Sequence, residues 1–163
     1  MEHLFAAWQK VSLSIAQAPG VALLFDYDGT LTPIVGRPDA ARLSPATRHL
    51  LVALVAKPRF GVAIVSGRTL EDLRQRVGVA GLVLAGNHGL EIATPRGSFL
   101  HPVAAASRPA LTAIATALRE VLRDIEGVLV EDKGLTLSLH YRQVPRGRVA
   151  LVGRCFREVT LPY

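Results

Sequence analysis

The fold of this chain is decided by residues 23–32, which read LLFDYDGTLT. An apolar run over residues 21–25 leads directly into Asp26 and Asp28, which a single residue separates. Buried parallel strands read as near-continuous apolar runs, and open α/β sheets bind ligands just beyond the carboxyl ends of such strands. We therefore expect both carboxylates at a functional crevice, where a divalent cation would relieve their mutual repulsion.

Composition limits the classes of protein to which the chain can belong. Its 163 residues, half of them hydrophobic, can form a real core, so the chain is not disordered. The formal charge is +6, but the arginines are scattered and no aromatic platform accompanies them. We expect this charge to attract an anionic phosphate ester as a small-molecule substrate, rather than nucleic acid.

Cysteine content and hydrophobic segments indicate where in the cell the chain is expected. Cys155 is the single cysteine, which excludes an internal disulfide and is compatible with a reducing cytoplasm. No apolar stretch approaches the ~20 residues of a membrane helix, and the early Glu2 is unlike a signal peptide. We expect a cytoplasmic chain that binds no membrane, and the sequence does not indicate its oligomeric state.

Hydrophobic periodicity predicts alternating strands and helices as far as Glu91. A helix over residues 3–17 precedes the first strand, at residues 21–26, and helices beginning at Ser44 and Thr69 precede strands at residues 60–65 and 82–85. This order predicts an α/β fold with a doubly wound, Rossmann-like parallel sheet.

The pattern changes after Glu91. A turn at residues 94–97 precedes a long helix at 105–125, strands near 128–131 and 136–141, and a helix at about 147–156. We read this part as a smaller α+β unit and place the boundary near residues 92–104. The expected domains are an N-terminal helix (1–19), the first half of a core (20–92) and a partial cap (93–163).

Two further polar strings follow predicted strands. Residues 62–68 read VAIVSGR, in which Ser66 and the backbone N–H groups of the turn could hold a phosphoryl group; alone, the string is equally a helix cap. Residues 85–91 read AGNHGLE, in which His88 could be a base, although a lone histidine is more often structural.

The string DYDGT resembles the DxDGT motif of the haloacid-dehalogenase-like phosphatases. Together with SGR, GNHGLE, EDKG at residues 131–134 and HYR at 140–142, it resembles the trehalose-6-phosphate phosphatases. The resemblance covers about residues 20–143, and four ordered motifs carry it, because EDKG and HYR belong to one motif. It implies an enzyme of trehalose biosynthesis with an incomplete haloacid-dehalogenase-like core, which hydrolyses trehalose 6-phosphate through an aspartyl-phosphate.

The resemblance also implies residue roles. Asp26 would be the nucleophile and Asp28 the general acid and base, and Asp26 with the backbone carbonyl of Asp28 would bind Mg²⁺. Thr30 and Ser66 would hold the phosphoryl group. Substrate contacts are implied for residues where core meets cap, namely Arg68, Asn87, His88, Glu131, Lys133 and Arg142. Glu131 and Lys133 could also be an ordinary charged hairpin, and Arg142 could equally pair with a carboxylate.

The chain departs from the family after its cap motif. The family also needs a later lysine and a final acidic motif, usually GDDxTDE, and neither occurs before Tyr163. We therefore expect a C-terminally truncated phosphatase, weakly active or inactive alone, whose strand at residues 21–26 lies at a sheet edge. The alternatives are a phosphatase for another sugar phosphate and a non-catalytic sugar-phosphate binder.

Overall fold

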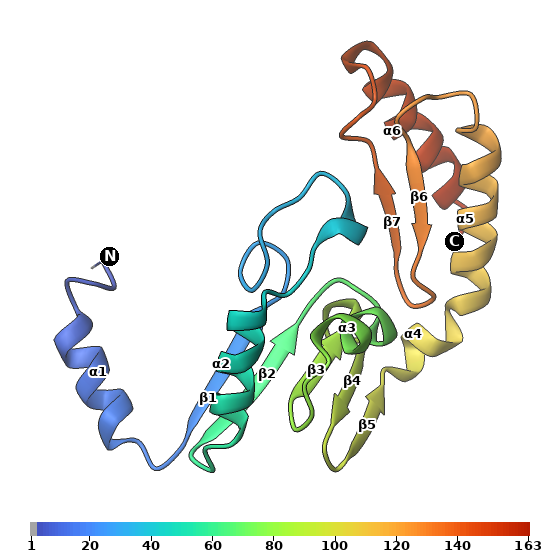
Figure 1. The fold of residues 1–163 in the computed structure, drawn as a ribbon. Helices are drawn as coiled ribbons and strands as arrows, with labels where there is room; N and C mark the ends of the chain where they lie inside the picture. The colour runs from blue at the N-terminus through green and yellow to red at the C-terminus, as the bar shows by residue number, and fades with distance from the viewer. Residues whose placement is uncertain (1–2) are drawn as a thin grey trace.

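A computed structural model describes residues 3–163 as a five-stranded sheet with a separate two-stranded hairpin and flanking helices (Figure 1). The sheet runs in the order β1-β2-β3-β4-β5. Its first three strands are parallel, as the sequence predicts: β1 (Val21–Asp26), β2 (Phe60–Val65) and β3 (Val83–Gly86). Within residues 3–163, β1 has a neighbour on one side only, so the predicted sheet edge is confirmed.

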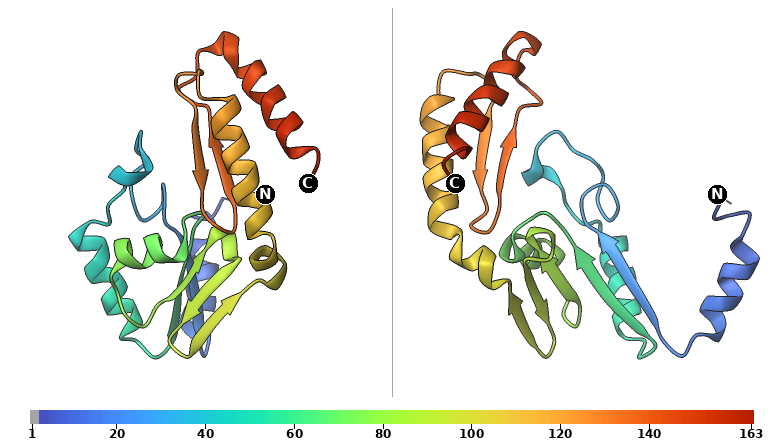
Figure 2. Two further views of the ribbon diagram at one scale, coloured as in Figure 1. Left: turned by 90° about the vertical axis from the view of Figure 1, so that its right-hand side faces the viewer. Right: turned by 180° about the vertical axis from the view of Figure 1, so that it is seen from behind.

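Two helices connect these strands and cover one face of the sheet: α2 (Pro45–Val55) and α3 (Leu70–Val77) (Figure 2). Both begin at the predicted caps, because Ser44 Oγ accepts from Thr47 N at 3.0 Å and Thr69 Oγ1 accepts from Asp72 N at 3.1 Å. Between this face and the helices lies the first apolar cluster, whose fully buried members include Tyr27, Leu51, Ile64, Leu73 and Val77.

The opposite face of the sheet is open over β1. Leu24 points to this face and is 67% exposed, whereas Leu23 and Phe25 are half-buried on the side of the helices. Because side chains alternate along a strand, the near-continuous apolar run of β1 is buried on one side only in residues 3–163.

Strands β4 (Glu91–Thr94) and β5 (Gly97–Leu100) continue the sheet as an antiparallel hairpin. The sequence predicts the turn at residues 94–97 but not the two strands around it. Both strands belong to the main sheet, so a boundary between core and cap near the later end of the range 92–104 fits them better. The division into core and cap stays a prediction.

The second unit stands above the sheet and has its own apolar cluster (Figure 1). It comprises the short helix α4 (Pro102–Ala106), the helices α5 (Arg108–Val121) and α6 (Arg146–Thr160), and the antiparallel strands β6 (Leu129–Asp132) and β7 (Leu137–His140). Leu118 of α5, Val130 of β6 and Val152 of α6 are buried together in this cluster. The two clusters share no residue, so each unit has a separate core.

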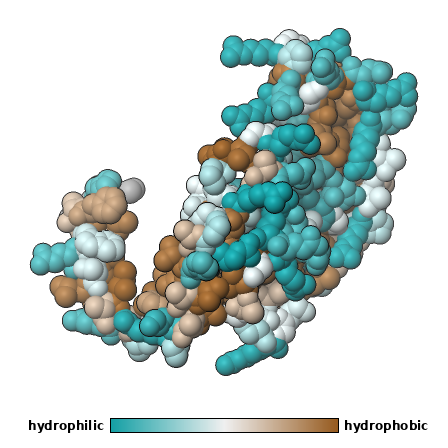
Figure 3. Space-filling view, in the orientation of Figure 1, coloured by the Kyte–Doolittle hydropathy of each residue, from teal (hydrophilic) through white to brown (hydrophobic). Residues whose placement is uncertain are grey.

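Helix α1 (Trp8–Gln17) is shorter than the predicted helix over residues 3–17, because residues 4–6 form turns instead. It buries no residue, and its apolar side chains, such as Trp8 and Leu13, are about half exposed (Figure 3). Arg59 joins it to the body by donating to the carbonyl oxygens of Ile15, Ala16 and Ala18. None of the helices in residues 3–163 has the length and apolar character that crossing a membrane requires.

We expect Gly86→Ala to destabilise the fold by about 3 kcal/mol, since overpacking a tight site typically costs this much. A Cβ at this position would lie 2.4 Å from Leu70 N and 2.7 Å from Leu70 Cα, which are backbone atoms that cannot rotate away. Urea unfolding measures the loss. Gly61→Ala in β2 is the control, because its Cβ would meet nothing within 4 Å; an equal loss in both variants would contradict the argument.

Candidate active site

Three parallel strand ends meet at one edge of the sheet. In the register of the sheet Asp26 pairs with Val65, and Val65 pairs with Ala85. The residues that follow, 27–30, 66–68 and 87–88, must therefore lie beside one another. This is the edge at which open α/β sheets bind ligands.

A tight turn after β1 sets the position of Asp28. Gly29 N donates to Thr32 O at 2.9 Å and Thr32 N donates to Tyr27 O at 3.0 Å. Gly29 has a φ of +88°, which a glycine adopts without strain. The turn buries Tyr27 below it and leaves Asp28 and Thr30 exposed above it.

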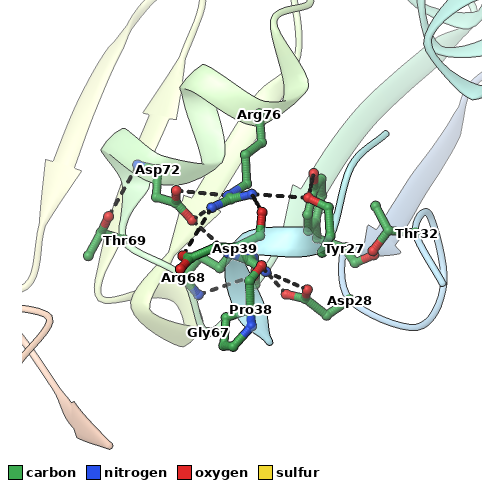
Figure 4. A network of polar contacts seen from close by, with 12 residues as sticks. Tyr27, Asp28, Thr32, Pro38, Asp39, Gly67, Arg68, Thr69, Asp72 and Arg76 are labelled. Carbon is green, nitrogen blue, oxygen red and sulfur yellow. Dashed lines mark hydrogen bonds and ion pairs between the residues drawn. The ribbon is translucent and has the colours of Figure 1, made fainter. Parts of the chain in front are cut away.

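Arg68 is the centre of the polar network at this edge (Figure 4). Its Nε and Nη2 donate to the two carboxylate oxygens of Asp28 at 2.9 and 2.8 Å, and its Nη1 donates to Asp72 Oδ2 at 2.8 Å. Nη2 also donates to Pro38 O at 2.7 Å. A planar guanidinium matches a carboxylate with two parallel hydrogen bonds, so this fork fixes both the position and the orientation of Asp28.

Hydrogen bonds between the acidic and basic groups of this network favour their ionised forms. Only 9% of the Arg68 side chain is exposed, and burial alone would lower its pKa, but the hydrogen bonds to Asp28 and Asp72 outweigh burial and raise it. Burial likewise opposes ionisation of Asp72, yet the hydrogen bonds from Arg76 and Arg68 hold the Asp72 pKa below its ordinary value. Arg68 also lies over the Tyr27 ring, 5.4 Å from its centroid. Arg68 and Asp72 are therefore charged at neutral pH.

Ser66 and His88 lie in the loops that follow β2 and β3. Ser66 is buried and its Oγ accepts from the backbone N of Arg68 at 3.2 Å. His88 adopts a left-handed φ of 58° and lies against Gly67, where an added Cβ would come within 2.6 Å of the His88 Nε2 atom. The glycine of the SGR string therefore allows the histidine of the GNHG string to lie directly on it.

The tip of the β6–β7 hairpin rests on these loops. Lys133 Nζ donates to Gly67 O at 3.1 Å, and Thr136 Oγ1 donates to Asn87 Oδ1 at 2.6 Å. Glu131 lies between two nitrogen-bearing side chains of the hairpin, with Oε2 3.5 Å from Lys133 Nζ and 2.8 Å from His140 Nε2. Side chains from residues far apart in the sequence thus meet at one place.

Between the hairpin and the strand ends lies a cleft of about 760 Å³. Six of the predicted site residues line it: Asp28, Arg68, His88, Glu131, Lys133 and Arg142. The other four, Asp26, Thr30, Ser66 and Asn87, do not line it, although Asp26 and Ser66 lie at the same edge of the sheet. Their functional roles stay predictions.

The oxygen atoms available at the end of β1 are of the kind that a hard cation prefers as ligands. Asp26 offers an exposed carboxylate, and no backbone N–H of residues 3–163 donates to the Asp28 carbonyl oxygen. Mg²⁺ prefers oxygen ligands and is commonly held by one or two carboxylates together with waters and substrate phosphate. Within the described residues no group of three acidic, histidine or cysteine side chains gathers as a preformed metal site.

Four contributing residues were not predicted as site residues: Asp72, Glu91, Thr136 and His140. Glu91 and His140 occur within the quoted motifs, so the motif pattern could have identified them, and Thr136 lies two residues after the EDKG string. Asp72 lies four residues after Arg68, a spacing that brings the two side chains together at the start of α3.

Comparison with known proteins identifies the family of this chain. The family model for trehalose-phosphatase matches residues 24–160. The chain belongs to the trehalose-phosphatase family. A trehalose-phosphate phosphatase from Mycobacterium bovis is 41% identical over 161 residues, which is 96% of this chain and 40% of that protein. One from Mycolicibacterium paratuberculosis is 44% identical over 137 residues, which is 83% of this chain and 34% of that protein.

Solved structures support the same fold. The C-terminal domain of Candida albicans trehalose-6-phosphate phosphatase matches with a TM-score of 0.76 at 25% identity, over 94% of this chain and 55% of that one. A trehalose-6-phosphate phosphatase related protein matches in fold with a TM-score of 0.77 at 20% identity, over 87% of this chain and 61% of that one. The predicted haloacid-dehalogenase-like fold is confirmed. The chain spans about 40% of the length of its curated relatives.

We expect Arg68→Lys to destabilise the trehalose-phosphatase fold by about 2 kcal/mol, because one ammonium cannot replace a fork that binds two carboxylates and a carbonyl. Urea unfolding followed by circular dichroism measures the loss. Arg74→Lys is the control, because Arg74 is 58% exposed and forms one loose ion pair at 3.6 Å. The argument fails if the two variants are equally stable.

A second prediction concerns the acid stability of the network. Since the folded-state pKa of Asp72 lies below the value of 3.8 for the free residue, its ionised form stabilises the fold fully above pH 3.8. This stabilisation is lost as the pH falls through the lower, folded-state pKa. Asp72→Asn should therefore be less stable than the parent chain at pH 7, with the difference shrinking below pH 3.8.

Thermal unfolding at a series of pH values tests this dependence. Glu126→Gln is the control, because Glu126 is exposed and forms no ion pair with the residues that the structure describes. If the difference in unfolding temperature between Asp72→Asn and the parent is the same at every pH, ion pairing of the Asp72 carboxylate with its arginines does not stabilise the fold.

Proposed function

We propose that these residues form the nucleophilic and sugar-binding part of a phosphatase that hydrolyses trehalose 6-phosphate. One observation carries the proposal: Asp28, at the end of β1, and Glu131 and Lys133, on the hairpin, line the same cleft. Asp28, together with Asp26 at the same edge of the sheet, can act on a phosphoryl group while the polar hairpin contacts the alcohol that leaves. Named relatives along almost the whole chain support this substrate.

The reaction requires two displacements at phosphorus. The Asp26 carboxylate attacks phosphorus, the bond to the sugar oxygen breaks, and Asp28 supplies the proton that this oxygen needs. Asp28 then removes a proton from water, which attacks the aspartyl-phosphate and regenerates Asp26. Both oxygens of Asp28 now accept from Arg68, so Asp28 must turn from this fork to exchange a proton with the substrate.

The remaining residues supply charge and polar contacts. Arg68, Lys133 and Arg142 present cations to the cleft, which suits a phosphate ester. Thr30 and Ser66 lie in the loops after β1 and β2, outside the cleft lining, and would offer hydroxyl groups to the phosphoryl oxygens. Mg²⁺, held by Asp26 and the Asp28 carbonyl, would neutralise charge on the phosphoryl oxygens. We assign this chemistry to the cytoplasm, with which the single free cysteine, Cys155, is compatible.

The size and polarity of the cleft support a disaccharide phosphate. Its volume of about 760 Å³ lies within the range usual for small-molecule sites. Glu131 can accept hydrogen bonds from sugar hydroxyls, and Lys133 can donate to them. A sugar that leaves these half-buried groups unpaired would bind poorly, which gives the hairpin a role in specificity.

We expect the chain to release phosphate from trehalose 6-phosphate in the presence of Mg²⁺, and Asp26→Asn to abolish this release because an amide cannot attack phosphorus. The rate should lie far below the usual enzymatic range of about 1–10³ s⁻¹, since the 163 residues lack the lysine and acidic motif that the resemblance implies. A malachite-green phosphate assay measures both. Asp39→Asn is the matched control, being a nearby exposed aspartate of the cleft.

The alternatives predict other outcomes of this assay. Faster release from sucrose 6-phosphate would favour a different sugar phosphate. Binding of trehalose 6-phosphate by calorimetry, with no release above that of Asp26→Asn, would favour a non-catalytic binder. Release that survives in Asp26→Asn would contradict the assignment of the nucleophile.

A further inference from the structure

The side-chain amide of Asn87 lies between the two units of the chain. Asn87 follows β3, is fully buried, and forms hydrogen bonds with both the core and the hairpin through its side-chain amide. Its Nδ2 donates to Glu91 Oε1 at 2.7 Å, and its Oδ1 accepts from Thr136 Oγ1 at 2.6 Å. Because a carboxylate only accepts, the NH₂ group must face Glu91 and the carbonyl oxygen must face Thr136.

The core holds this amide rigidly. Glu91 Oε1 also accepts from Leu70 N, the first residue of α3, at 2.7 Å. The backbone N of Asn87 donates to Arg68 O at 2.7 Å, and the next residue donates from its own N to Ser66 O at 2.9 Å. Asn87 keeps a left-handed φ of 46°, which asparagine tolerates better than most residues. The position of its Oδ1 is therefore set before the hairpin arrives.

On the hairpin side, the contacts come from a stiff turn. Asp132 Oδ1 accepts from Gly134 N at 2.8 Å, and Lys133 N donates to Thr136 O at 3.0 Å. This turn presents three groups to the core: the Thr136 hydroxyl, the Lys133 carbonyl at 3.4 Å from Asn87 Nδ2, and the Lys133 ammonium on Gly67 O. Figures 1 and 2 show the tip directly above the loops that follow β2 and β3.

We propose that Asn87 is a positioning residue, and that its hydrogen bond from Thr136 latches the hairpin tip to the core so that Lys133 and Glu131 face Asp28 across the cleft. In this arrangement the buried amide does not touch the sugar; it acts through the hairpin. The role in catalysis rests on the proposed function, whereas the latch itself requires no turnover.

The chemistry of the contact makes it reversible. When the hairpin lifts away, water can satisfy both Thr136 and Asn87, so opening exchanges hydrogen bonds instead of losing them. A closed hairpin without the Thr136 donor, by contrast, buries the Asn87 oxygen without its partner. Removing the hydroxyl should therefore shift the closed-to-open ratio by about tenfold toward the open form.

A distance measurement between the units tests the latch. Spin labels at Ala53→Cys on α2 and Arg157→Cys on α6, both exposed positions, would report the separation in a Cys155→Ser background by double electron–electron resonance without substrate. Thr136→Val keeps the size and β-branching but removes the donor, and Thr136→Ser keeps the donor. Ser138→Val is the matched control, since Ser138 lies two residues after Thr136, within β7, and its hydroxyl bonds no described residue.

We expect a longer and broader distance distribution in Thr136→Val, and the parent distribution in Thr136→Ser and Ser138→Val. The same distribution in Thr136→Val and the parent would overturn the proposal, as would equal opening in Ser138→Val. Circular dichroism verifies folding, and Thr136→Ala removes the same donor if the valine variant does not fold. In a complete enzyme, loss of the latch should raise KM more than it lowers kcat, because the free enzyme must close on its substrate.

These outcomes are independent of the phosphatase assay. A chain that releases no phosphate can still show the distance change, which would support the latch although the expected phosphate release fails. Release that depends on Asp26, without any distance change in Thr136→Val, would support the proposed function and overturn the latch.

Discussion

The register of the three parallel strands is the constraint on which the rest of the structure depends. Asp26, Val65 and Ala85 lie side by side, so the loops that follow them must share one small area. Gly86 makes this possible, because any larger residue there would collide with the backbone at the start of α3. Three short strings, separated by about 20 to 40 residues, become one site because the strands end at the same level.

The buried charge of Arg68 at this edge also depends on how closely these loops lie together. A buried arginine with one lost partner would be costly, but Arg68 has Asp28, Asp72 and a carbonyl oxygen around it. Arginine contacts also tie the loop at residues 33–42 to α3 and to the turn before it, since Pro38 O accepts from Arg68 and Ala41 O accepts from Arg76 of α3. The network that orients the proposed acid therefore also shapes one wall of the cleft.

Much of this arrangement could be predicted from the sequence, because it follows from local rules. Apolar runs identified β1, β2 and β3, and the side-chain caps Ser44 and Thr69 identified where helices begin. The short strands β4 and β5 were missed because four residues give too little alternation to count. Asn87 was assigned to the cleft, since nothing local reveals that its amide meets Thr136, 49 residues away.

The cleft lies between two apolar cores that share no residue, and this division explains why polar contacts matter there. Each core stabilises its own unit, but neither fixes the distance between Glu131 and Asp28. Glu131 is held within the hairpin by Lys133 and His140, so the hairpin can move as one piece and keep its polar groups in order. The distance of the hairpin tip from the core therefore has to be fixed by contacts between the two units. Hydrogen bonds that water can replace suit that task better than apolar burial, because a site that admits and releases a disaccharide, as the proposed function requires, needs a closure of modest free energy.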